Sequence, residues 1–153
     1  MGVSMKDIDG LNGLITDDWT DWTEGVEITQ EMINTFADVT KDHQWVHVDI
    51  EKANAGPFGG PIAHGFLTLS LVSFFSAQVG PKIDGVLGVL NYGADRLRFL
   101  NPVPVGSRVH ARSRVREITE KDSGVLLKQE VTVHVVGDER PALVYESLAL
   151  LLG

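Results

Sequence analysis

An aspartate and a histidine five residues apart, Asp42 and His47, are the side chains of this sequence best suited to chemistry. A carboxylate is ionised at neutral pH, and an imidazole changes its charge close to neutral pH. Together the two groups can hold one water molecule and move its proton, which is general acid–base catalysis. Such a pair is also common on protein surfaces, where the aspartate would be a turn residue and the histidine half exposed.

A second feature is the turn-rich segment 56–61, which leads through His64 and Gly65 into a long apolar run. We predict that a helix begins at Gly65, so its free N–H could donate to a carbonyl oxygen that gains negative charge, with the helix dipole adding to the effect. The alternative is that the glycine merely lets helix and sheet approach closely. Combined with Asp42 and His47, this donor predicts a water-activating pair that faces an oxyanion site.

These groups need elements that hold them in place. The sequence predicts a helix over residues 30–41, because Thr29 can cap its first turn and its apolar side chains share one face. A second, short helix is predicted over residues 51–55. Asp42 and His47 are therefore expected to lie outside regular structure, between two helices.

Residues 66–79 are apolar nearly all the way round, apart from small hydroxyl residues. The run is shorter than the roughly 20 residues that a spanning helix needs, so it predicts a buried helix wrapped on most sides by a sheet. Four later runs, rich in Val and Leu, predict a long antiparallel meander; they cover residues 86–100, 107–119, 125–136 and 142–151. This is an α+β layout.

Length and composition limit the possible classes. With 153 residues, 43% hydrophobic and 22% charged, we expect one domain over residues 1–153, with residues 1–22 as an N-terminal arm pinned by Trp19 and Trp22. A net charge of −8 argues against nucleic acid and anionic membranes as partners. The absence of cysteine excludes a thiol nucleophile and thiolate zinc sites. Without a continuous apolar stretch near Met1, we expect no signal peptide and a cytoplasmic protein.

Other histidines raise the question of a metal. His43 and His47 have the spacing of a helical zinc pair, but Gln44 stands where the metalloprotease motif has glutamate, and the segment is not predicted to be helical. We therefore predict no metal site. His64 is expected to be a neutral scaffold histidine bonded to backbone, whereas the strand residues His110 and His134 are expected to be solvated.

At these residues the chain resembles the MaoC-like, R-specific enoyl-CoA hydratases, also called type-2 hydratases or 3-hydroxyacyl-thioester dehydratases. The resemblance runs from about Thr29 to the C-terminus. It depends on three motifs: Asp-x4-His at 42–47, Gly-x-Ile-Ala-His-Gly at 60–65, and Arg-Phe-Leu-Asn-Pro-Val at 98–103 followed by Gly106. It implies a hot-dog fold, in which a long antiparallel sheet wraps around a central buried helix, and a homodimer with a continuous sheet.

The same resemblance implies that Asp42 and His47 are the catalytic pair and that the Gly65 N–H is the oxyanion donor. The implied reaction, in fatty acid metabolism, is reversible addition of water to a trans-2-enoyl thioester of CoA or acyl carrier protein, giving an R-3-hydroxyacyl thioester. It needs no metal or redox cofactor, because the thioester carbonyl itself acidifies the neighbouring carbon. Thr68 falls where some members have a serine, which suggests substrate binding.

Two further residues are candidates for substrate binding. The chain has Gln44-Trp45 where many members have Asn-Pro, so Trp45 could shape the acyl tunnel and chain-length preference, or fill core. Asn91 could line the pocket or be an ordinary strand residue.

Alternative functions remain open from the sequence. Hot-dog folds also host acyl-thioesterases, and fold alone does not choose between them. A non-catalytic acyl-thioester-binding subunit is another possibility, as is a polyketide or nodulation-related dehydratase with a different substrate. The Asp42–His47 pair favours hydration, and its presence together with Gly65 argues against lost activity.

Overall fold

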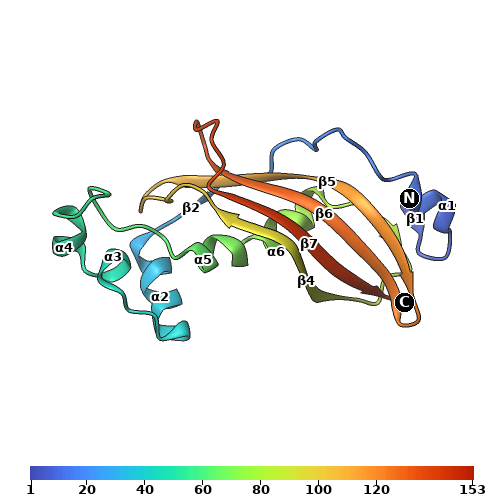
Figure 1. The fold of residues 1–153 in the computed structure, drawn as a ribbon, viewed down its shortest axis with the longest axis horizontal. Helices are drawn as coiled ribbons and strands as arrows, with labels where there is room; N and C mark the ends of the chain where they lie inside the picture. The colour runs from blue at the N-terminus through green and yellow to red at the C-terminus, as the bar shows by residue number, and fades with distance from the viewer.

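The computed structural model describes all residues from 1 to 153 and shows a curled sheet with helices on its concave side and a helical lobe at one end (Figure 1). The strands are β1 (Val3–Ser4), β2 (Val26–Glu27), β3 (Ile83–Asp84), β4 (Gly88–Phe99), β5 (Arg108–Lys121), β6 (Gly124–Val135) and β7 (Leu143–Leu152). The helices are α1 (Ile8–Asn12), α2 (Gln30–Thr40), α3 (Trp45–Val48), α4 (Ile50–Asn54), α5 (Gly65–Ser70) and α6 (Val72–Val79). The four long runs predicted as strands are β4 to β7.

The main sheet has the order β2-β5-β6-β7-β4, with every pair of neighbours antiparallel. The predicted simple meander is wrong at one point, because β4 pairs with β7 and not with β5. The chain between β4 and β5 crosses to the other edge and is held on the way, since Val103 O accepts from Ala63 N at 2.8 Å and Pro61 O from Val105 N at 2.9 Å. Alternation along a strand reports which face is buried, not which strand lies beside it.

The predicted helix start at Gln30 is confirmed. The hydroxyl of Thr29 accepts from the N–H of Met32 at 3.1 Å. Helix α2 ends at Thr40, and its C-cap Lys41 is left-handed with a φ of 64°. The expectation that His47 lies outside regular structure is wrong, because His47 lies in the four-residue helix α3. Asp42 does lie in the loop between α2 and α3.

The apolar run forms α5 and α6, which are separated at Leu71. Its buried side carries Leu67, Val72 and Phe75, which pack in the main core. The opposite side is open, because Phe66 is 62% exposed and Phe74 is 48% exposed. The expectation that this run is wrapped by the sheet on most sides is therefore wrong for a single chain, because the sheet covers only one side of α5 and α6. No helix of the structure is long and apolar enough to cross a membrane.

The N-terminal arm runs along the edge of β5, where Thr20 N donates to Ser113 O at 3.0 Å, and its two tryptophans pin it to the outward-facing side chains of β5, as predicted. The guanidinium of Arg112 lies 4.5 Å from the ring of Trp22 and 5.0 Å from that of Trp19. Trp22 also stacks on His110, with ring centroids 4.0 Å apart. His134 lies against Trp22 and is buried, so the expectation of two solvated strand histidines was wrong. Sequence alternation could not show that the arm covers this part of the outer face.

Candidate active site

His47 is a buried imidazole with one free nitrogen. Its side chain is 8% exposed, and Nδ1 lies 2.7 Å from the carbonyl oxygen of Ile62. Since a carbonyl oxygen only accepts, Nδ1 must carry the proton, and in the neutral ring Nε2 is left as an acceptor. The backbone of His47 is held as well, because the Gln30 amide donates to its carbonyl oxygen at 2.9 Å. The structure thus presents His47 as an oriented base.

Burial lowers the pKa of His47 below its ordinary value, and the nearby His64 lowers it further. The hydrogen bond to Ile62 and the carboxylate of Asp42 act in the opposite direction but do not outweigh burial. A lowered pKa keeps the imidazole neutral at neutral pH, with the Nε2 lone pair available to take a proton.

This pKa shift predicts a pH-dependent stability. The unfolded chain binds a proton on this histidine near its ordinary pKa of about 6.5, whereas the folded chain binds it only at lower pH. Between the two values the unfolded state holds more protons, so this contribution to the free energy of unfolding is present above about 6.5 and is lost as the pH falls. Denaturant unfolding at pH 7.5 and 5.5 should therefore show a larger loss for the wild type than for His47→Gln. Equal losses would contradict the shift.

Asp42 places its carboxylate beside this histidine. Asp42 is exposed, and its Oδ1 accepts from the N–H of Gln44 at 3.3 Å, which holds the side chain in the turn before α3. One ligand atom from each of Asp42, His47 and His64 lies within 4.8 Å of the others. That spacing leaves room for a water molecule between the carboxylate and the imidazole.

The same three residues could in principle hold a metal ion, so their geometry needs a test. The rings of His47 and His64 are stacked, with centroids 3.9 Å apart and planes inclined by 24°. An imidazole lone pair lies in the plane of its ring, and zinc binds at about 2.0–2.1 Å along it. Because the two planes are nearly parallel, their lone pairs do not converge on one ion. The arrangement suits a proton-moving site better than a metal site.

Gly65 is the first residue of α5, where a helix leaves its N–H groups without intrahelical acceptors. The close approach considered for this glycine is present, since an added Cβ would lie 2.8 Å from Cδ1 of Phe99. Gly65 also lines a cavity, which is where a donor to a developing oxyanion would have to lie. Gly65 therefore satisfies the packing requirement and lies where an oxyanion donor is needed.

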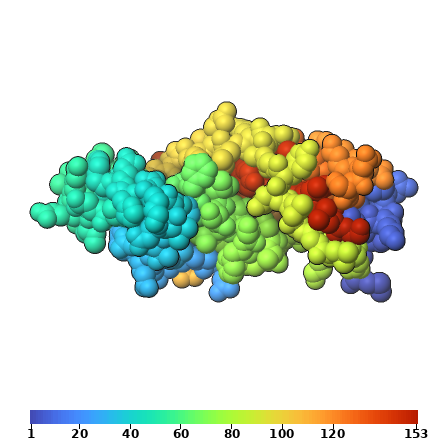
Figure 2. All heavy atoms as spheres, turned by 90° about the horizontal axis from the view of Figure 1, so that it is seen from below, coloured from blue at the N-terminus to red at the C-terminus, as the bar shows by residue number.

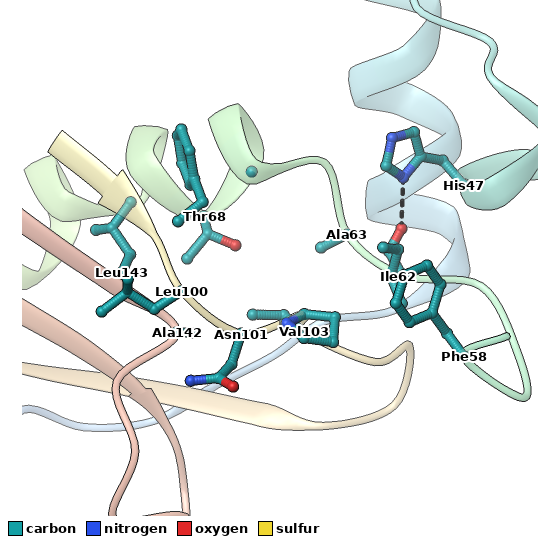
Figure 3. A pocket seen from close by; sticks show the side chains of 13 residues that line it. His47, Phe58, Ile62, Ala63, Thr68, Leu100, Asn101, Val103, Ala142 and Leu143 are labelled. Carbon is teal, nitrogen blue, oxygen red and sulfur yellow. Dashed lines mark hydrogen bonds between the residues drawn. The ribbon is translucent and has the colours of Figure 1, made fainter.

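The cavity has a volume of about 290 Å³ and lies between the helices and the crossing chain (Figure 3). His47, Gly65 and Thr68 line it together with mostly apolar neighbours, among them Val103 and Leu143. The hydroxyl of Thr68 is buried and makes no hydrogen bond within the chain. A buried polar group without a partner is costly, so this hydroxyl is available to a bound molecule.

Residues 16–137 match the family model described as MaoC like domain. The chain belongs to the MaoC-like family. This MaoC-like chain is 48% identical over 130 residues to 3-hydroxyacyl-thioester dehydratase Z of Mycobacterium tuberculosis; the alignment covers 84% of this chain and 83% of that protein. It is 41% identical over 152 residues to nodulation protein N of Rhizobium meliloti, with 97% of this chain and 91% of that protein covered.

A solved structure gives the same result for the fold. The (R)-hydratase from A. caviae involved in PHA biosynthesis superposes with a TM-score of 0.72 at 25% identity, covering 88% of this MaoC-like chain and 96% of that one. The predicted α+β hot-dog fold and the family resemblance are thus confirmed. The long β4 to β7 strands curl over one side of α5 and α6.

The predicted site residues of this MaoC-like chain fall into two groups. His47, Gly65 and Thr68 share the cavity, and Asp42 lies beside His47 without lining it. The structure does not bring the other two there, so their substrate-binding roles are without support from the geometry: Trp45 packs against Gly56 and Lys52, and Asn91 is exposed on β4.

Sequence reasoning missed three contributors to the site. They are the Ile62 carbonyl oxygen, the Gln30 amide and the Phe99 ring that covers Gly65. Of these residues, Ile62 lies in the 60–65 motif and Phe99 in the 98–103 motif. The role of a backbone carbonyl or of a distant amide has no sequence signal of its own.

Proposed function

We propose that this MaoC-like protein catalyses the reversible, R-specific hydration of trans-2-enoyl thioesters to 3-hydroxyacyl thioesters. The observation that carries the proposal is His47, with its Nε2 free, beside Asp42 at a cavity that Gly65 also lines. Relatives named as a 3-hydroxyacyl-thioester dehydratase and an (R)-hydratase support this hydro-lyase assignment. The substrate is a thioester of CoA or of acyl carrier protein.

The groups at the site account for every proton of the reaction. Asp42 and His47 hold a water molecule, and Nε2 of His47 takes one proton as the oxygen bonds to C3 of the enoyl group. The electrons of the double bond move to the thioester oxygen, which accepts from the Gly65 N–H and from the Thr68 hydroxyl. C2 then takes the proton from the His47 imidazolium, and the base is restored. The reverse sequence is dehydration.

A direct assay tests the proposal: loss of enoyl-thioester absorbance on mixing the protein with crotonyl-CoA, followed by chiral analysis of the product. Hydration predicts loss of absorbance and R-3-hydroxybutyryl-CoA. Release of free CoA thiol with the double bond intact would identify a thioesterase instead. No loss of absorbance with crotonyl-CoA, with longer enoyl-CoA thioesters or with acyl-carrier-protein thioesters would indicate a binding subunit without activity.

We also propose a homodimer formed through β4. This strand is one edge of the sheet, and an unpaired edge offers a row of backbone donors and acceptors to another chain. Its side chains are unusually apolar for an exposed edge, since Val89, Leu90 and Tyr92 are each more than half exposed. The open side of α5 and α6 adjoins β4 on the same face (Figure 2), and the ring centroid of Phe66 lies 5.5 Å from that of Phe99 on β4. A second copy of the chain paired along β4 would cover both the apolar side chains of β4 and the open side of α5 and α6.

A charge placed on this edge should separate the copies. Leu90→Lys is expected to shift the protein from a two-chain to a one-chain mass, because a lysine ammonium resists burial at an apolar interface. Sedimentation equilibrium measures the mass. Val39→Lys is the matched control, since Val39 is 76% exposed but lies on α2 away from the sheet edge. A wild type that sediments as one chain, or a Leu90→Lys variant that stays paired, would overturn the dimer.

A further inference from the structure

His64 occupies a closed position between the parts of the candidate active site. Its side chain is 3% exposed, with the His47 ring stacked on it at 3.9 Å and the Phe36 ring packed against it at 5.0 Å. Its Nε2 lies 3.0 Å from the backbone carbonyl oxygen of Asp42. One side chain therefore contacts the ring of one proposed catalytic residue and the peptide of the other.

The hydrogen bond fixes the form of this ring. The Asp42 carbonyl oxygen can only accept, so Nε2 of His64 carries the proton, and Nδ1 of the neutral ring is an acceptor. That Nδ1 is buried and has no donor within the chain. A buried, unpaired acceptor is destabilising, and an apolar ring at this position would avoid that cost. A phenylalanine here would fill the space but would release the Asp42 peptide.

The Asp42 loop needs such a support. Asp42 is exposed and follows the left-handed Lys41, and its side chain is tied only to Gln44 within the same turn. His64 is the N-cap of α5, so its hydrogen bond to the Asp42 carbonyl oxygen connects this loop to the helix that begins with Gly65. A displacement of about 1 Å between reacting groups can cost on the order of 10²-fold in rate.

We propose that His64 is a positioning residue, which holds the Asp42 loop by its Nε2–H and the His47 ring by stacking, so that carboxylate and base keep one spacing relative to the oxyanion donor. This role rests on the proposed hydration. The groups facing His64 are the Asp42 carbonyl from the α2–α3 loop, His47 from α3 and the apolar Phe36 from α2.

Two substitutions separate the hydrogen bond from the ring. His64→Phe keeps a stacked ring and removes the donor, and should lower kcat with crotonyl-CoA by on the order of 10²-fold with little change in KM. His64→Gln can still donate to the Asp42 carbonyl, so it should lose less. His134→Gln is the matched control: it removes an equally buried histidine on the outer face, away from the site, and should keep wild-type kcat.

Histidine NMR supplies a readout that does not need activity. Wild type should show His64 protonated on Nε2 and His47 protonated on Nδ1. His64 protonated on Nδ1 would overturn the inference, even if His64→Phe failed to fold. The inference would also be overturned if both His64 variants had wild-type kcat, or if their loss of kcat only matched the fraction of protein that is unfolded. Absence of hydration by the wild type would instead reject the proposed function.

Discussion

Replacing His47 with glutamine is expected to lower kcat for enoyl-thioester hydration by about 10²–10⁴-fold, the usual contribution of a general base. Glutamine keeps a polar group of similar reach but has no lone pair basic enough to take a proton from water. The loss should appear in kcat more than in KM, because the apolar walls of the cavity, such as Val103 and Leu143, are untouched. Initial rates with crotonyl-CoA at pH 7.5 measure it.

The control for this substitution lies four residues earlier. His43→Gln removes an exposed imidazole that pairs with Asp38 at 2.8 Å and does not line the cavity, so it should retain wild-type kcat. Circular dichroism would establish that both variants are folded. Normal turnover by folded His47→Gln would reject the assigned base and, with it, the mechanism.

The closeness of Asp42, His47 and Gly65 could be predicted from the sequence because they are near one another along the chain. Asp42 lies in the turn before α3 and His47 lies in α3, and the short helix α4 and the loop 55–64 then lead to the helix start at Gly65. Such short connections leave few ways to arrange the groups, and Thr29 marks the preceding helix start by its own capping bond. The runs that became β4 to β7 were equally visible, because half-buried strands alternate.

Other features of the fold depend on contacts distant in sequence and had no local signal. The pairing of β4 with β7 depends on where the crossing chain is held, and the burial of His134 depends on Trp22, more than a hundred residues earlier. The tautomer of His47 is fixed by the Ile62 carbonyl, which any residue could have provided. Trp45 is a different case: a bulky residue in a motif suggested either the acyl tunnel or core, and the structure packs it against Gly56, outside the lining of the cavity.

Asp42→Asn is expected to lower kcat by about 10²–10⁴-fold while leaving stability within about 0.5 kcal/mol of the wild type. Stability should hold because Asp42 is exposed, and the asparagine oxygen can still accept from the N–H of Gln44. The rate should fall, because an amide has no negative charge to orient water beside His47 or to stabilise the imidazolium formed during turnover.

The effect of the Asp42 carboxylate on the pKa of His47 can be measured separately from the rate. The Asp42 carboxylate raises the pKa of His47 against the larger effect of burial, so Asp42→Asn should move the titration midpoint of His47 to lower pH. Asp38→Asn is the matched control, since Asp38 is an exposed carboxylate of α2 that pairs with His43 and contributes nothing to this shift. An unchanged His47 midpoint together with wild-type turnover in Asp42→Asn would mean that the two residues do not act as a pair. A lost rate and a lowered midpoint would identify the carboxylate as the partner of the base.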